Sequence, residues 1–314
     1  MYNTEAEYEN RLAKLQDCDT NKEKENIMNQ EKENSHERLE AVDTAQEYYN
    51  SHDAHTFYST IWGGEDLHIG TFRKPEDTIY DASRRSVDEI AALSYNILNM
   101  SECNLLDIGS GIGGTARHLV NRYGCRVTGL NLSEVENSRH RRKNKEQGFD
   151  DRIDVHDGAF ENLPFQDESF DVVWSEDAIL HSGDRKRVLE EAYRVLKKGG
   201  EMVFSDPLQT QGCFSEFLQP ILDRLHLNSL ATSKFYEATA LELGMEIVHH
   251  RSKPQQLLNH YGRILEETIA REDELRANGV SEDYLEHMKK GLENWVIGAK
   301  YGHLDWVWFC FRKV

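Results

Sequence analysis

The chain has 314 residues, which allows one large domain with appendages, and its hydrophobic content of 38% permits a sizeable buried core. Its formal net charge of -19 disfavours nonspecific binding to nucleic acid or anionic lipid, because phosphates would be repelled. Five unclustered cysteines disfavour a disulfide framework and a zinc site, and no apolar run is long enough to cross a membrane.

Residues 1–40 are rich in Glu, Lys and Asn and poor in large apolar side chains. This composition predicts a charged tail, either a solvated helix or a disordered segment. Residues 41–100 are rich in aromatic residues and end in a stretch with apolar residues at helical spacing, with Asp81 or Ser83 as its cap. We therefore expect a helical N-terminal cap over 41–100 that carries active-site aromatic residues.

Strands and helices alternate over residues 101–207, which predicts a parallel sheet covered by helices on both faces. The helix before the fifth strand is expected to have Gly199 and Gly200 past its end, and the fifth strand is expected to stop at Pro207. The expected strands are 104–109, 125–133, 153–160, 170–177 and 201–207, and the helices between them are 113–124, 134–148 and 184–200.

Beyond Pro207 the alternation loosens. Residues 208–244 predict helices of a lid insertion placed before the next strand. Residues 245–314 are expected to complete the sheet with strands 245–252 and 303–314, which flank helices over about 254–275 and 281–299.

The stretch LLDIGSGIGGTARHL (105–119) places a glycine-rich turn between a strand and a helix. Gly109, Gly111 and Gly114 spell G-x-G-x-x-G, which is weak evidence for a dinucleotide site on its own. NAD enzymes hold the ribose with an acidic residue about 20 positions further on, where this chain has Asn131. The pattern also fits the looser loop of S-adenosylmethionine (SAM) enzymes, with Asp107 before it and Gly113 inside it.

Further positions favour SAM. A carboxylate at Asp107 suits the ammonium of the methionine moiety, and Asp157, after the third strand, could accept from the adenine amino group. Together with RVLKKGGEMVFSD before the fifth strand, segment 103–206 resembles the core of class I SAM-dependent methyltransferases. That resemblance implies an α/β, Rossmann-like, seven-stranded, mostly parallel sheet. It also implies these cofactor-binding residues: Leu67, His68, Asp107, Gly109, Gly111, Gly113, Asn131, Leu132, Asp157, Gly158, Ala159, Phe160 and Glu176.

The flanking sequence narrows the family. YYNSHDAHTFYSTIWGGEDLHIGTF before the core, with VTGLNLS and WSEDAILHSGDR inside it, resembles the sarcosine/dimethylglycine N-methyltransferases that make glycine betaine. The resemblance extends from about Thr44 to the C-terminus. It implies methyl transfer from SAM to the amine of sarcosine, N,N-dimethylglycine or both, with S-adenosylhomocysteine (SAH) as the second product.

The related phosphoethanolamine N-methyltransferases suggest catalytic roles. In that family a tyrosine–histidine pair closes over the site and an aspartate meets the amine, which here implies Tyr49, His181 and Asp177. Tyr58 and Trp62 would present π faces to the growing quaternary ammonium. The phosphate-holding residues of that family are missing, and Arg224 remains as a cation that could grip a substrate carboxylate.

Three alternatives stay open at this point. The chain could methylate phosphoethanolamine or a sterol-like carbon, could bind SAM without catalysis, or could be a dinucleotide oxidoreductase. We expect a small-molecule amino-acid substrate and no metal, nucleic-acid or membrane partner, with a monomer or homodimer as the assembly. The polar N-terminal sequence is unlike a signal peptide, so we expect a cytoplasmic protein.

Overall fold

The computed structural model describes residues 52–62, 64–213, 215–225 and 227–314. The charged tail expected over residues 1–40 and the candidate Tyr49 lie outside these residues, and the proposed domain boundaries stay predictions. Of the helices in the described part of the chain, none is long and apolar enough to cross a bilayer.

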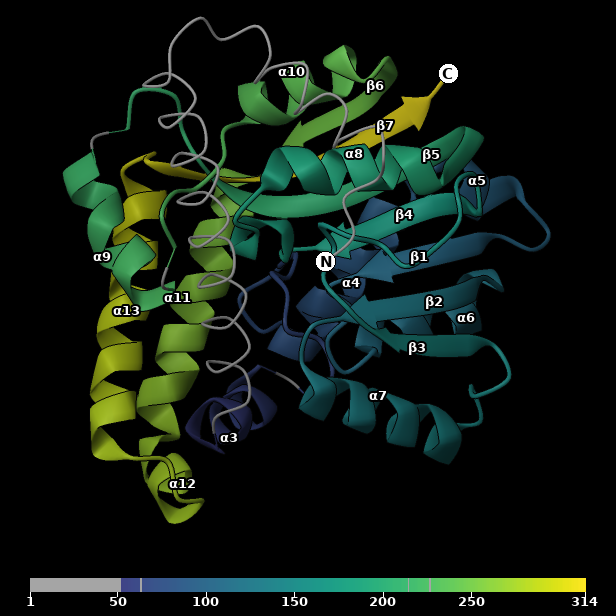
Figure 1. Ribbon diagram of the computed structural model, residues 1–314. Coiled ribbons are helices and arrows are strands. Elements are labelled where there is room, and N and C mark those ends of the chain that lie inside the picture. Colours follow the sequence, from purple (N-terminus) through teal and green to yellow (C-terminus); the bar gives the residue numbers. More distant parts are fainter. Residues whose placement is uncertain (1–51, 63, 214, 226) are drawn as a thin grey trace, which may run out of the picture.

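A seven-stranded sheet lies at the centre of the molecule, with the strand order β3-β2-β1-β4-β5-β7-β6 (Figure 1). β1 to β5 pair in parallel, whereas β7 is antiparallel to both of its neighbours. The predicted mostly parallel sheet is therefore confirmed. The strands are β1 (Asn104–Ile108), β2 (Arg126–Asn131), β3 (Ile153–Asp157), β4 (Phe170–Glu176), β5 (Leu196–Gln209), β6 (Met245–Ser252) and β7 (Leu304–Lys313).

The sheet separates two hydrophobic cores, because successive residues of a strand point to opposite faces. On β1, Leu105 packs into one core and Leu106 into the other. The first core lies under α3 (His52–Ile61), α4 (Ile79–Ala91), α5 (Tyr95–Asn99), α6 (Gly114–Tyr123), α9 (Ser215–Leu225), α11 (Pro254–Ala270), α12 (Glu272–Ala277) and α13 (Glu282–Lys300). The second lies under α8 (Arg185–Val195) and α10 (Ser233–Glu242).

Helix α7 (Glu134–Gln147) differs from the others because the side chains that it buries are polar. It packs beside β3 at one edge of the sheet, and α11 and α13 lie side by side at another end of the molecule (Figure 1). The buried polar face of α7 therefore has to find partners in the loops at the ends of the strands.

The expected boundary between α8 and β5 is wrong. The helix ends at Val195, and the strand includes Gly199, Gly200 and Pro207. Pro207 is tolerated because β4 pairs with β5 only as far as Ser205, so no β4 carbonyl needs an N–H from position 207. On its other side, Pro207 faces Trp306 of β7 in the antiparallel ladder.

Two helix boundaries also differ from expectation. The cap of α4 is Thr78, whose hydroxyl accepts from the backbone N–H of Asp81 at 3.0 Å, so neither Asp81 nor Ser83 is the cap. The helix expected over 254–275 divides at Arg271, whose backbone leaves the helical region. The guanidinium of Arg271 donates to the carbonyl of Thr60 at 2.6 Å, which ties the break to α3.

Candidate active site

A cavity opens at the carboxyl ends of β1, β2 and β4, beside the β1–β4 boundary where the strand order reverses. Doubly wound sheets bind their ligands at such a switch point. Residues 65–68, which come between α3 and α4, form part of its wall. The structure brings these sequence-predicted residues together there: Leu67, His68, Asp107, Gly109, Gly111, Asn131, Leu132, Gly158, Ala159, Phe160, Glu176, Asp177 and His181.

Gly113 belongs to the loop but does not line the cavity. It has a left-handed backbone with φ of 79°, and a Cβ atom there would lie 2.0 Å from Nε2 of His140. His140 is a fully buried residue of α7. The glycine is therefore needed for packing between the loop and α7, and the structure gives no contact of Gly113 with a ligand site.

Asp157 is also absent from the wall. Its carboxylate accepts from Nδ2 of Asn137 at 2.8 Å and from the guanidinium of Arg141 at 2.7 Å, so α7 holds it outside the cavity. The backbone that follows it, Gly158 to Phe160, does line the cavity.

Tyr58 and Trp62 lie in the first hydrophobic core and are not among the lining residues. Their ring centroids are 5.0 Å apart, and Trp62 also packs against His260 at 5.2 Å. The expectation that they present π faces to a ligand in this cavity is therefore not supported by their position. The placement fits the simpler interpretation that they pack α3 onto α11.

Arg224 is buried, with 4% of its surface exposed, and one guanidinium nitrogen lies 3.6 Å from Sδ of Met288. It passes close to α13 at Gly291, where a Cβ atom would lie 2.0 Å from its Cδ. Arg224 does not line the cavity, although its charge is one of the causes that depress the pKa of His181.

His181 ends the short 3₁₀ turn η1 (Ile179–His181) and lines the cavity. Its pKa is lowered to about 4, first because burial disfavours the imidazolium and then because Arg185 and Arg224 oppose a further positive charge. At neutral pH the ring is therefore neutral, and the same low pKa makes it a weak base.

Asp177 has an unusual backbone, with φ of 51°, and lines the cavity. Its carboxylate accepts from three protein donors at 2.7 Å: the backbone N–H of Ile69, the hydroxyl of Ser205 and the indole N–H of Trp306. The side chain thus ties segment 65–71 to β5 and β7. Strained backbone of this kind is concentrated at functional sites.

Asp107 ends β1 with its side chain against the cavity. Only 3% of its surface is exposed, and its Oδ2 atom is buried without a hydrogen-bond partner. Burial, reinforced by the charge of Glu176, raises the pKa of Asp107 to about 8. An orphaned carboxylate oxygen in a cavity wall is the feature expected of a group that meets a cationic ligand.

His68 and Glu176 face each other across the cavity wall, with 3.6 Å between His68 Nδ1 and Glu176 Oε1. Asp66 lies 3.8 Å from the other ring nitrogen of His68. Burial alone would lower the pKa of His68, but the charges of Glu176 and Asp66 outweigh it and raise the value. Burial raises the pKa of Glu176 to about 7.

Glu136 is a lining residue that the sequence analysis missed. It belongs to the first turn of α7, is 8% exposed, and accepts from Nδ2 of Asn131 at 2.8 Å. The acidic group missing from the end of β2 is therefore supplied from the helix that follows. The signal available in the sequence was the position of Glu136, which lies about one helical turn beyond the Ser133 cap and so near the end of β2 at Asn131.

Glu65 and Asp66 lie between α3 and α4, and the structure places both in the cavity wall. Glu65 forms ion pairs with Arg117 at 2.7 Å and Lys143 at 2.9 Å, and Asp66 lies 2.9 Å from Arg84. These pairs fasten the segment to α4, α6 and α7.

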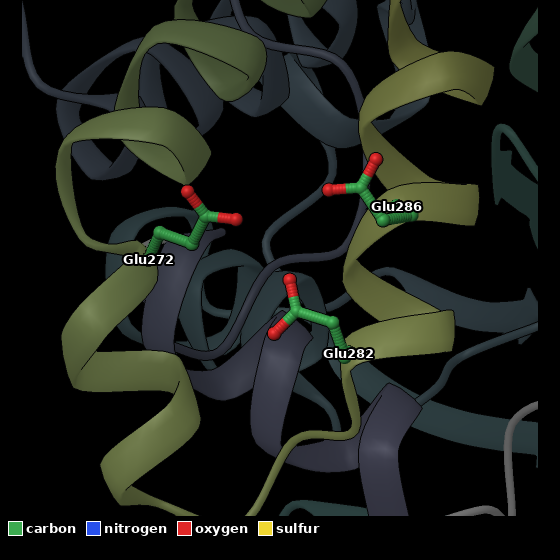
Figure 2. Close-up of side chains that lie close together, drawn as sticks. All are labelled: Glu272, Glu282 and Glu286. Carbon is green, nitrogen blue, oxygen red and sulfur yellow. The ribbon is translucent and has the colours of Figure 1, made fainter.

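A second acidic cluster lies far from the cavity. Figure 2 shows Glu272 of α12 and Glu282 and Glu286 of α13 with their carboxylates turned toward one another. Arg276 and Lys289 form ion pairs within this cluster, at 2.8 Å to Glu282 and 2.8 Å to Glu272. The carboxylates thus already have cationic partners, and we assign no metal to them.

The sheet order, the glycine loop and the acidic cavity at the switch point define a class I SAM-dependent methyltransferase. A family described as a methyltransferase domain matches residues 106–204. The chain belongs to the sarcosine/dimethylglycine N-methyltransferases, and its methyl donor is SAM.

The similarity covers nearly the whole length of the relatives. The sarcosine/dimethylglycine N-methyltransferase of Halorhodospira halochloris is 50% identical over 274 residues, which are 87% of this chain and 97% of that protein. The enzyme of the same name from Aphanothece halophytica is 48% identical, over 86% of this chain and 96% of its own. A solved structure of a candidate sarcosine dimethylglycine methyltransferase from Galdieria sulphuraria has a TM-score of 0.79 and 37% identity, and the match covers 85% of this chain and 98% of that one.

Proposed function

We propose that the protein transfers methyl groups from SAM to the amine of sarcosine, N,N-dimethylglycine or both, and so forms glycine betaine in the cytoplasm. The structural observation that carries the proposal is a neutral His181 on the cavity wall, with the buried cation Arg224 near enough to depress its pKa. A proton acceptor and a buried guanidinium suit a substrate that has an amine at one end and a carboxylate at the other.

The cavity residues fit SAM. The orphaned Oδ2 of Asp107 suits the ammonium of the methionine moiety, and Glu136 with Asn131 suits the ribose hydroxyls. Gly158, Ala159 and Phe160 would line the adenine with backbone and apolar surface. When bound, SAM supplies a methyl group activated on a sulfonium sulfur.

The protein has to position the amine and remove its proton. An amine of this kind is mostly protonated near neutral pH, as the lysine reference pKa of about 10.4 implies. In the proposal, the charge of Arg224, which lies behind the cavity wall, attracts the substrate carboxylate. That carboxylate raises the pKa of His181, which then accepts the amine proton and leaves the nitrogen lone pair free to attack. Asp177, already held by three donors, fixes the position of the wall beside the amine. Alignment of the reacting groups in this way lowers the activation barrier by several kcal/mol.

Incubation with labelled SAM and separate glycine, sarcosine, N,N-dimethylglycine and phosphoethanolamine tests the function. We expect label in the products from sarcosine or dimethylglycine, because one buried cation suits a carboxylate. Labelled product from phosphoethanolamine alone would overturn the proposed substrate assignment. SAM binding without labelled product from any amine would favour a noncatalytic protein, and NADH binding without SAM binding would favour an oxidoreductase.

The affinity for SAM is expected to rise by roughly tenfold between pH 6 and pH 8. Asp107, with a pKa raised to about 8, and Glu176, with one raised to about 7, hold protons at pH 6, and the cationic ligand favours their ionised forms. Titration calorimetry across this range measures the effect. Asp107→Asn is the control, which should bind weakly and lose much of the dependence, whereas a flat wild-type profile would contradict the electrostatic assignment.

A further inference from the structure

Acidic side chains predominate in the cavity wall. Among the described residues, no lysine or arginine lines the cavity, and the basic side chains that do are the histidines His68 and His181. Its carboxylate residues are Glu65, Asp66, Asp107, Glu136, Glu161, Glu176 and Asp177.

Three of these carboxylates, which we call the outer carboxylates, have polar partners in the surrounding protein. Glu65 is paired with Arg117 and Lys143, Asp66 lies beside Arg84, and Glu161 accepts from the hydroxyl of Ser182 at 2.6 Å. The ion pairs therefore reduce the field of Glu65 and Asp66 inside the cavity, whereas the hydroxyl of Ser182 is neutral and does not compensate the charge of Glu161.

Asp107 and Glu176, which we call the inner carboxylates, have fewer partners. Asp107 and Glu176 share the basic neighbour His68, whose Nδ1 lies 3.6 Å from Glu176 Oε1. Glu176 Oε2 accepts from the hydroxyl of Thr115 at 2.8 Å, but its Oε1, like Asp107 Oδ2, is buried without a hydrogen-bond partner. The side chain of Glu176 is 4% exposed and Asp107 is 3% exposed, so water screens neither. Two buried carboxylate oxygens without hydrogen bonds in one cavity favour the binding of a cationic ligand.

We propose that this unbalanced charge makes the site select the sulfonium of SAM over the neutral thioether of SAH, and that Glu176 is the residue mainly responsible. The inference rests on the proposed cofactor site. SAM carries an ammonium, a carboxylate and a sulfonium, for a net charge of about +1, whereas SAH has lost the sulfonium charge and is neutral overall. In the reaction the S–CH₃ bond breaks and an N–CH₃ bond forms, so the positive charge moves from sulfur to nitrogen while electrons stay balanced.

Glu176 is singled out by its place in the cavity. Asp107 would face the ammonium and Glu136 the ribose, and both of these groups are the same in SAM and SAH. Glu176 ends β4, its carboxylate lies 3.6 Å from His68, and Asp177 and the turn that carries His181 follow it directly in the chain. In the proposal, the reacting methyl lies beside this turn. Its charge therefore acts on the one group that differs between the two ligands. The consequence is a site that binds its substrate cofactor and releases the spent product.

Calorimetric Kd values for SAM and SAH on the wild type, Glu176→Gln and Glu136→Gln test the proposal. We expect Glu176→Gln to shift the ratio of the two Kd values about tenfold toward SAH, which corresponds to about 1.4 kcal/mol. Glu136→Gln, the same chemical change at the ribose, should weaken both ligands and keep their ratio within about twofold of the wild type. An unchanged ratio in Glu176→Gln would overturn the inference.

A measurement on the wild type alone keeps the test independent of folding of the variant. Sinefungin, which carries an amine where SAM has its sulfonium, should bind more tightly than SAH, and equal affinities would contradict charge selection. If the wild type binds neither SAM nor SAH, the proposed cofactor site itself fails. If it binds both but does not distinguish sinefungin from SAH, only the inference about selection fails.

Discussion

The variant His181→Ala is expected to lower kcat by about 10²-fold or more, the usual contribution of a positioned general base. The pKa of His181 is lowered to about 4 by burial and by the charges of Arg185 and Arg224, so the wild-type ring is neutral at neutral pH. In the proposal, the bound substrate carboxylate offsets these charges and makes the ring a stronger base. Removing it takes away the imidazole to which the proposal assigns the amine proton. Initial rates with saturating SAM and sarcosine or dimethylglycine measure the loss.

A control separates this effect from a loss of structure. His250→Ala removes a partly exposed histidine of β6 whose ring pairs with Glu237, and it should leave kcat within about twofold of wild type. The SAM affinity of His181→Ala should fall much less than its kcat. Rates that recover at high pH, where more of the free amine is already deprotonated, would support proton removal as the lost step, whereas an unchanged kcat would exclude His181 from it.

The sheet could be predicted because its signals are local. Alternating apolar strands and amphipathic helices fix a parallel α/β arrangement, and left-handed glycines such as Gly124 and Gly148 end their helices as expected. The boundary between α8 and β5 could not be predicted in the same way. The pairing of β5 with β4 and β7 decided it, and those partners are distant in sequence.

The cavity residues that follow strand ends were also accessible from sequence, because parallel strands present their carboxyl ends at one edge. Asp107, Asn131 and Glu176 meet there. Residues placed by α7 were not accessible. Glu136 reaches the cavity and Asp157 is drawn away from it because the buried face of α7 is polar, and a helix of low amphipathicity gives no indication of which side chains it buries.

The variant Gly113→Ala is expected to lower the free energy of unfolding by about 3 kcal/mol, through left-handed backbone strain and overpacking together. The backbone φ of Gly113 is 79°, and an added methyl would lie 2.0 Å from the ring of the buried His140. That ring belongs to α7, so relieving the clash would require the loop and the helix to move apart. Chemical denaturation without SAM measures the change.

Gly111→Ala is the matched control for this strain. It has φ of 49° in the same loop and nothing within 4 Å of the new methyl, so it should cost only about 1 kcal/mol. In the background His140→Ala the ring is gone, and the cost of Gly113→Ala should fall to the value seen at Gly111, a coupling of about 2 kcal/mol in a double-mutant cycle. Equal costs for Gly113→Ala with and without the His140 ring would show that packing against α7 does not require the glycine. Coupling would establish that Gly113 serves the fold, while its neighbours of the same loop in the cavity wall serve the ligand.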